Sequence, residues 1–434
     1  MRSVIKFILS KGGRQMKRKL WEKAMAMVLV GGTVLSMGVG TAAEEYHQIY
    51  TYEDRNALSG LTTPLMEDRA DIDKALPTEQ HGDLKIGFSL GSMHSEFFVA
   101  MVEAAQKKCD EFGYELVVLD ADGSVSKQSS DMDSLVTMGC DLIVINPNDT
   151  VANAADVEAA VEAGIPVIGC GADMAYDVPL VTSCLASNFF GGWESGLYVG
   201  EQLKDMELNA GIIEGAAGHT IDESRMTGMI SGILYVRAEQ QGNPYECKED
   251  AYWDGLKMFE ELRDNGKVYN EEFKFNILSM TGEGGWNEEG GLACMEDMLV
   301  AVPEMNLLMT GSDPMGIGAI KAIKDYGLTP GKDVYVACAA DGGLAANKYL
   351  ESGEMLCTGY NSPYLTGSAE ITLAHMIFEE GFDASDLPTV TALPNACITK
   401  DNYEEYTDPD LDYCIELPIE VKSIPEIKAE LGAE

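Results

Sequence analysis

Aromatic and planar polar side chains stand directly after several apolar runs of this chain. Phe97 and Phe98 are adjacent aromatics at a helix start, in the loop after the first apolar run. Asp341 and Asn361 also follow predicted strands, and Trp286 stands in a polar, glycine-rich stretch. Aromatic faces stack on C–H surfaces, while carboxylates and amides hydrogen-bond hydroxyl groups in a fixed plane. These residue types therefore predict noncovalent binding of a small polar ligand.

Motifs of common catalytic and cofactor sites are missing from the sequence. There is no HExxH and no Ser/His/Asp order, and the chain has 5 histidines. The glycine-rich run at 282–285 has Asn287 where a dinucleotide fingerprint needs its third glycine. Asp120 to Ser124 resembles the start of a calcium loop, but its glycine comes too early, so a loop between strand and helix is favoured. We therefore expect no enzymatic activity, no cofactor and no metal.

The elements that must position these residues alternate between strand and helix. Short apolar runs are typical of buried parallel strands, and the helical period between them is typical of crossover helices. The predicted strands of the first part are Leu84–Leu90, Tyr114–Leu119 and Asp141–Ile145. The helix from Glu96 places one apolar stripe toward the core, namely Phe98, Met101, Val102, Ala105, Cys109 and Phe112. In such sheets ligands bind at the carboxyl ends of the strands.

A second series of the same kind follows and predicts a second parallel sheet. Its first helix is predicted from Gly191, and its strands are Ala210–Glu214, Phe273–Leu278, Asn306–Thr310 and Val334–Ala339. With 434 residues and 46% hydrophobic content, the chain is long enough for two cores. The formal charge of −42 disfavours nucleic acid as a partner, because phosphates would be repelled.

The amino-terminal segment is typical of an export signal. Lys17, Arg18, Lys19 and Lys23 precede an apolar stretch that ends in small residues at 41–43. Met16 is an alternative start. No cysteine follows the stretch closely, since the first is Cys109, so a lipid anchor is not expected. The 10 cysteines show no CxxC spacing, and most are expected to be unpaired core thiols.

Several motifs in one order resemble the type I periplasmic binding proteins, and the nearest branch is that of the ribose and galactose binders of ABC importers. They include SEFFVAMVEAAQKKC from Ser95, then DLIVINPNDT, AGIPVIG, SNFFGGWESG, GSDPMGIGAIKAI, VACAADGG and CTGYNSPYLTG, and they cover roughly 84–403. The resemblance implies an α/β fold of two Rossmann-like, doubly wound parallel-sheet lobes joined by a three-segment hinge.

By this resemblance the chain divides into five parts. Residues 1–43 are the signal peptide, and 44–83 are an N-terminal extension that serves as a spacer. The N-terminal lobe comprises 84–186 plus 362–388, the C-terminal lobe comprises 187–361 plus 389–420, and 421–434 form a tail. The crossings between lobes are expected near Ser187, Asn361 and Pro388, with the helix Tyr364–Glu380 returning to the first lobe. Met226 to Tyr269 is longer than in the sugar binders and is expected to insert a helix or loop near the cleft mouth.

The resemblance also implies a ligand site between the lobes. Its expected members are Ser95, Phe97, Phe98, His219, Arg225, Trp286, Ser312, Asp313, Asp341 and Asn361. Four of them have a structural alternative: Phe98 and Trp286 could be core residues, Asp341 a helix cap and Asn361 a turn residue. A rival register aligns Tyr252 to Gly255 with the family's arginine helix, and Arg225 would then lie on the surface.

The chain departs from the sugar binders at positions that bind hydroxyls. Ser95 stands where ribose-type binders carry Asn, and Gly171-Ala172 stands where they carry Asp-Arg, although Asp173 could compensate. Ile221 stands where the sugar binders carry a site aspartate. Ser312-Asp313 replaces the family's Asn-Asp pair, so the first of these two contacts is shortened to a hydroxyl. The ligand therefore need not be ribose or galactose.

The function that the resemblance implies is that of an exported solute-binding protein for a small polar ligand, with a sugar or sugar-like compound favoured. Its expected partners are that ligand and the membrane subunits of an ABC permease, and the protein is expected to be a monomer. The alternative is a binding protein of the same fold that signals to a membrane kinase or chemoreceptor.

Overall fold

A computed structural model of the protein describes residues 76, 82–171, 174 and 178–426. Its first sheet has six strands in the order β12-β5-β4-β3-β1-β2, and all of its pairings are parallel. The strands are β1 (Lys85–Leu90), β2 (Glu115–Asp120), β3 (Leu142–Asn146), β4 (Val167–Cys170), β5 (Ser183–Ala186) and β12 (Val390–Leu393). Every residue of β3 is buried, as expected for a parallel strand covered on both faces.

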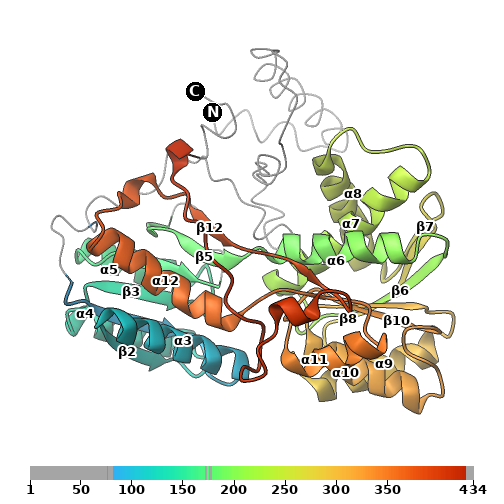
Figure 1. Cartoon of the computed structure of the whole chain (residues 1–434), viewed down its shortest axis with the longest axis horizontal. Coiled ribbons are helices and arrows are strands. Elements are labelled where there is room, and N and C mark those ends of the chain that lie inside the picture. Colours follow the sequence, from blue (N-terminus) through green and yellow to red (C-terminus); the bar gives the residue numbers. More distant parts are fainter. Residues whose placement is uncertain (1–75, 77–81, 172–173, 175–177, 427–434) are drawn as a thin grey trace. The chain divides into compact units, whose positions relative to one another are not determined.

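Three helices of the first lobe follow its strands, and a fourth returns from late in the chain. They are α3 (Glu96–Phe112), α4 (Val125–Thr137), α5 (Ala154–Glu162) and α12 (Pro363–Phe378). The predicted stripe on α3 is only partly covered, with Met101, Ala105 and Cys109 fully buried. Helix α12 packs against α3, so this late segment lies beside the helices of the first sheet (Figure 1).

The second sheet has five strands in the order β10-β9-β6-β8-β7. They are β6 (Leu208–Ile213), β7 (Val268–Asn270), β8 (Phe275–Thr281), β9 (Leu307–Thr310) and β10 (Tyr335–Cys338), of which β7 alone is antiparallel to its neighbour. Its helices are α6 (Asn188–Gln202), α7 (Thr220–Gln240), α8 (Lys248–Asn265), α9 (Glu288–Ala301), α10 (Asp313–Asp325) and α11 (Leu344–Ser352). The doubly wound architecture is therefore confirmed in both lobes.

Helix α6 begins three residues earlier than predicted. Ser187 is its N-cap, because the Ser187 side chain accepts a hydrogen bond from the backbone N–H of Phe190. The long segment 226–269, which was expected to insert a helix or loop, supplies most of α7, the whole of α8 and the first two residues of the edge strand β7. Helix α8 packs on α7.

The third crossing between the lobes was predicted near Pro388, and this prediction is wrong because the strand after Pro388 still belongs to the first sheet. Residues 390–393 form β12, which pairs in parallel with β5 at the edge of the first sheet. A strand at that edge completes the burial of β5, so the chain leaves the first lobe only after Leu393. The next strand, β13 (Cys397–Ile398), pairs antiparallel with β11 (Thr358–Gly359), and the two form a short ribbon of their own.

All 10 cysteines are unpaired, and 8 of them are buried. Burial raises the pKa of the Cys109 and Cys414 thiols to about 12, as expected for inert core thiols. Among the described residues, no helix is both long and apolar enough to cross a membrane. The segment 1–43, for which a signal peptide was predicted, lies outside the described residues, as do nearly all of 44–83 and the end of the tail.

Candidate functional site

Arg225 stands at the centre of a buried polar cluster in the second lobe. Its side chain donates from Nε to Asn188 Oδ1 at 3.0 Å and from Nη1 to the carbonyl of Gly311 at 2.8 Å. Nη1 also lies 3.7 Å from Asp341 Oδ1. Asn361 donates from Nδ2 to the same Asp341 oxygen at 3.2 Å. The structure thus brings together three of the predicted site residues, which we call the Arg225 cluster: Arg225, Asp341 and Asn361.

The rival register, with Tyr252 in the site, does not fit this geometry. It would leave Arg225 on the surface, whereas Arg225 is only 5% exposed. Tyr252 is 1% exposed, and its ring packs edge-on against Phe189 and Trp193. Tyr252 is therefore a core residue between α6 and α8.

The close packing of α6 on α7 determines the position of Arg225. Glycines face each other across the two helices, and a Cβ atom at Gly192 would lie 1.9 Å from the carbonyl oxygen of Arg225. A Cβ at Gly228 would lie 2.0 Å from the carbonyl oxygen of Phe189. Only glycine permits such an approach of two helix backbones. The Arg225 side chain consequently meets Asn188 at the start of the neighbouring helix.

Asp313 and Ser312 lie at the start of α10 and present polar atoms without partners. Asp313 accepts a hydrogen bond at Oδ2 from the Gly343 N–H at 2.8 Å. Asp313 Oδ1 and Ser312 Oγ are buried and have no hydrogen-bond partner among the described residues. Burial, together with the nearby Asp341 carboxylate, raises the pKa of Asp313 to about 6. Burial also raises the pKa of Asp341, while the Arg225 charge opposes that rise.

Trp286 and His219 form an aromatic pair at the carboxyl side of the second sheet. Their ring centroids are 5.5 Å apart in an edge-to-face arrangement. The Trp286 ring lies over Gly215, where a Cβ would come within 2.2 Å of it. Trp286 is half-buried with a φ of 57°, while His219 is exposed and caps α7 by accepting from the Ile221 N–H at 3.3 Å. Trp286 is thus neither a core residue nor fully exposed.

Asp222, the neighbour of Ile221, is not among the site residues expected from the sequence. Asp222 is fully buried, and its Oδ2 accepts hydrogen bonds from the backbone N–H groups of Gly215 and Ala216 at 3.0 and 3.1 Å. It thereby fixes the loop on which Trp286 rests. Its Oδ1 has no partner among the described residues, and burial raises its pKa to about 7.

The first lobe supplies aromatic and small polar residues rather than a charged cluster. Ser95 is exposed and caps α3 by accepting from the Phe97 N–H at 3.3 Å. Phe97 and Phe98 are half-buried and edge-to-face, with centroids 5.8 Å apart. Phe98 packs against the core of the lobe, whereas Phe97 meets the ring of Tyr413 at 5.6 Å. Phe97 is therefore better placed than Phe98 to contact a ligand.

Asn148, at the carboxyl end of β3, was also missed. Its Nδ2 is buried without a hydrogen-bond partner among the described residues, while its backbone N–H donates to Gln128 Oε1 at 2.7 Å. A polar residue just after a buried strand is the signal that could have identified it. Of the departures from the family, Gly171 lies at the end of β4, while Ala172 and Asp173 lie outside the described residues.

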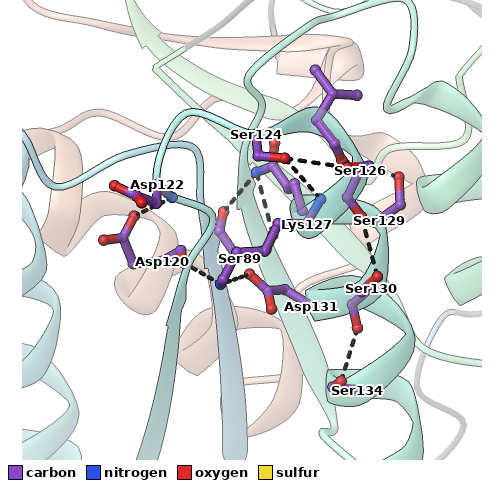
Figure 2. A network of polar contacts seen from close by, with 12 residues as sticks. Ser89, Asp120, Asp122, Ser124, Ser126, Lys127, Ser129, Ser130, Asp131 and Ser134 are labelled. Atoms are coloured by element: carbon purple, nitrogen blue, oxygen red, sulfur yellow. Dashed lines mark hydrogen bonds and ion pairs between the residues drawn. The ribbon is translucent and has the colours of Figure 1, made fainter.

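The segment that resembled a calcium loop is a turn between β2 and α4. Figure 2 shows its polar groups engaged with one another at the start of α4. Asp120 Oδ1 accepts from the Asp122 N–H, and Ser124 caps the helix at the Lys127 N–H. Lys127 donates to Asp131 at 2.8 Å (Figure 2). Within the described part of the chain, no group of three or more His, Cys, Asp or Glu side chains is placed to hold a metal ion.

Comparison with known proteins decides the family. The sequence model of the periplasmic binding protein domain matches residues 86–381. The chain belongs to this family. It is 26% identical over 296 residues to the ribose import binding protein of Haemophilus influenzae, covering 68% of this chain and 85% of that protein.

Solved structures of the family share this fold. An ABC transporter solute-binding protein from Mycobacterium smegmatis with bound glycerol superposes with a TM-score of 0.60 at 22% identity, covering 77% of this chain and all of that chain. A periplasmic solute-binding protein from Actinobacillus succinogenes with bound D-allose gives a TM-score of 0.59 at 20% identity and covers 75% of this chain. The resemblance inferred from the motifs, to the ribose and galactose type, is thus confirmed.

Proposed function

We propose that this periplasmic binding protein is exported, captures a sugar or sugar-like compound and delivers it to an ABC permease. The Arg225 cluster is the observation that carries the proposal. Its guanidinium is held by Asn188 and Gly311, so it is fixed before a ligand arrives. The partnerless Asp313 Oδ1 and Ser312 Oγ add an acceptor and a hydroxyl close by. Such groups suit ligand hydroxyls, and the faces of Phe97 and Trp286 suit the C–H surface of a sugar ring.

The protein binds its ligand without transforming it. The carboxylate of the cluster, Asp341, contacts an arginine and an amide rather than a nucleophile that it could activate. The relatives that it matches are named for ribose import, which supports the same role here. In this proposal the segment 1–43 is a signal peptide, the mature protein acts as a monomer, and the ligand lies between the two lobes.

A ligand screen tests this function directly. We expect thermal unfolding of the purified protein to shift upward by several degrees with at least one member of a panel of pentoses, hexoses, deoxysugars and polyols. A ligand present at a hundred times its dissociation constant stabilises the folded form by about 2.7 kcal/mol. A shift with amino acids alone would contradict the assignment to sugars and leave the fold untouched.

Asp341→Asn provides the matched variant for the screen. It keeps the size and planarity of the side chain but removes the charge that faces Arg225. We expect at least a tenfold loss of affinity for the carbohydrate with the largest shift, together with a lower melting temperature without ligand, because the buried Arg225 loses its facing charge. Glu158→Gln, an exposed carboxylate on α5, is the control and should leave affinity unchanged.

A further inference from the structure

Tyr413 lies in the segment after β13, beyond the residues that the family model matches. Its half-buried ring packs edge-to-face against Phe97, with centroids 5.6 Å apart. The Tyr413 ring also lies 3.9 Å from the position of a Cβ at Gly343, and that position is 3.6 Å from Asp313 Oδ2. Tyr413 therefore stands between the first-lobe aromatic loop and the second-lobe acids.

The backbone on both sides of Tyr413 is anchored. The carbonyl of Asp412 accepts from the Leu344 N–H at 2.8 Å, and its N–H donates to the hydroxyl of Tyr364 at 3.2 Å. The Cys414 carbonyl accepts from Ser362 Oγ at 2.7 Å. These bonds reach helices of both lobes, α11 and α12, as well as the cap of α12. A ring held in this way loses little conformational entropy when a ligand packs on it.

The charges around Tyr413 keep its phenol protonated. Burial and the nearby carboxylates of Asp341, Glu96 and Asp313 raise its pKa above the ordinary value. The ring therefore stays neutral and can stack on a C–H surface, while its hydroxyl remains a donor.

We propose that Tyr413 is a ligand-contacting residue, an aromatic wall that the carboxy-terminal segment adds to the sugar site beside Phe97, Asp313 and Asp341. The inference rests on the proposed function. It predicts a preference for cyclic sugars over open-chain polyols, because a ring sugar presents a continuous C–H face to an aromatic wall.

Tyr413→Ala and Tyr413→Phe test the inference with D-ribose, D-galactose, D-allose and ribitol as probes, by calorimetry on the full protein. We expect Tyr413→Ala to weaken the tightest-binding cyclic sugar at least tenfold and ribitol less. Tyr413→Phe keeps the ring and should stay within about threefold of the natural protein. Tyr406→Ala is the matched control, since this half-buried tyrosine of the same segment contacts Tyr360 instead, at 5.9 Å. It should leave affinity unchanged.

The outcomes separate the inference from the function on which it rests. If the natural protein binds a sugar and Tyr413→Ala binds it equally well, the role of Tyr413 is overturned and the proposed function is preserved. An equal loss for cyclic and open-chain probes would make Tyr413 a residue that only orders Phe97, and would overturn direct contact. If neither these probes nor any member of the wider carbohydrate panel binds the natural protein, both proposals are wrong.

Discussion

The two lobes contribute to the candidate site in different ways. The second lobe holds charged groups in a buried network, in which Arg225 is bonded to Asn188 and Gly311 and faces Asp341. The first lobe offers the exposed cap residue Ser95 and the half-buried ring of Phe97, neither of which carries a charge. A network of buried charges must be built before ligand arrives, because unpaired charges are costly in a protein interior. The uncharged ring of Phe97 needs no such network.

This difference suggests a division of labour. The second lobe would set the orientation of ligand hydroxyls through fixed donors and acceptors, and the first lobe would add apolar contact on closure. We therefore expect substitutions in the second lobe to lower both the stability of the fold and the affinity for ligand. A substitution in the first lobe should change one of these two quantities without the other.

Breaking the Arg225 cluster should have the largest effect. Arg225→Met leaves Asp341 facing an apolar side chain, and we expect a loss of roughly 3 kcal/mol in the free energy of unfolding, together with at least a hundredfold loss of sugar affinity. Urea unfolding and calorimetry measure the two. The double variant Arg225→Met/Asp341→Leu should regain stability but not affinity. Full stability of the single variant would contradict a buried network.

Glu370 on α12 gives the first lobe a buried carboxyl of its own, away from the predicted site residues. It is fully buried, neither oxygen has a hydrogen-bond partner among the described residues, and burial raises its pKa from 4.5 to about 8. The folded protein therefore binds more protons than the unfolded chain between these values, so the stability that this group contributes is full below pH 4.5 and falls as pH rises toward 8.

Replacement of this carboxyl should remove that pH dependence. We expect Glu370→Gln to raise the free energy of unfolding at pH 8.5 by on the order of 3 kcal/mol and to change it little at pH 4.5. Urea unfolding at both pH values measures the effect, with Glu158→Gln as the exposed control. An equal effect at the two pH values would show that Glu370 is not protonated in the folded protein.

The glycine contact between α6 and α7 should come next in size. In Gly192→Ala the new methyl group meets the Arg225 carbonyl, so we expect a loss of roughly 2 kcal/mol in stability and a parallel loss of sugar affinity as Arg225 moves. Gly191→Ala is the neighbouring control, because its Cβ would lie 3.2 Å from the nearest atom rather than 1.9 Å. Similar losses in both variants would point to helix propensity instead of helix packing.

The smallest effect is expected at Ser95. Ser95→Ala removes the side-chain cap of α3 and should lower the free energy of unfolding by about 1 kcal/mol. Ser95→Asp should restore the cap and the stability. If Ser95 also contacts the ligand, both variants will lose affinity. If both variants keep the affinity of the natural protein, the role of Ser95 is restricted to capping.

The sequence by itself determined the fold class and the order of elements. Apolar runs of strand length and the helical period between them are local patterns, so the elements of the first lobe could be predicted within one or two residues. The residue types of the site were also readable, because Arg225, Asp341 and Asn361 stand beside recognisable motifs.

Tertiary structure alone decided which of these residues meet. The partner of β12 is β5, more than two hundred residues earlier, and no local pattern indicates that pairing, so the crossing was placed too early. Asn188, Asp222 and Tyr413 acquire their positions from a glycine helix contact, a loop and an anchored carboxy-terminal segment. Their importance depends on distances between parts of the chain that are far apart in sequence, and such distances exist only once the chain has folded.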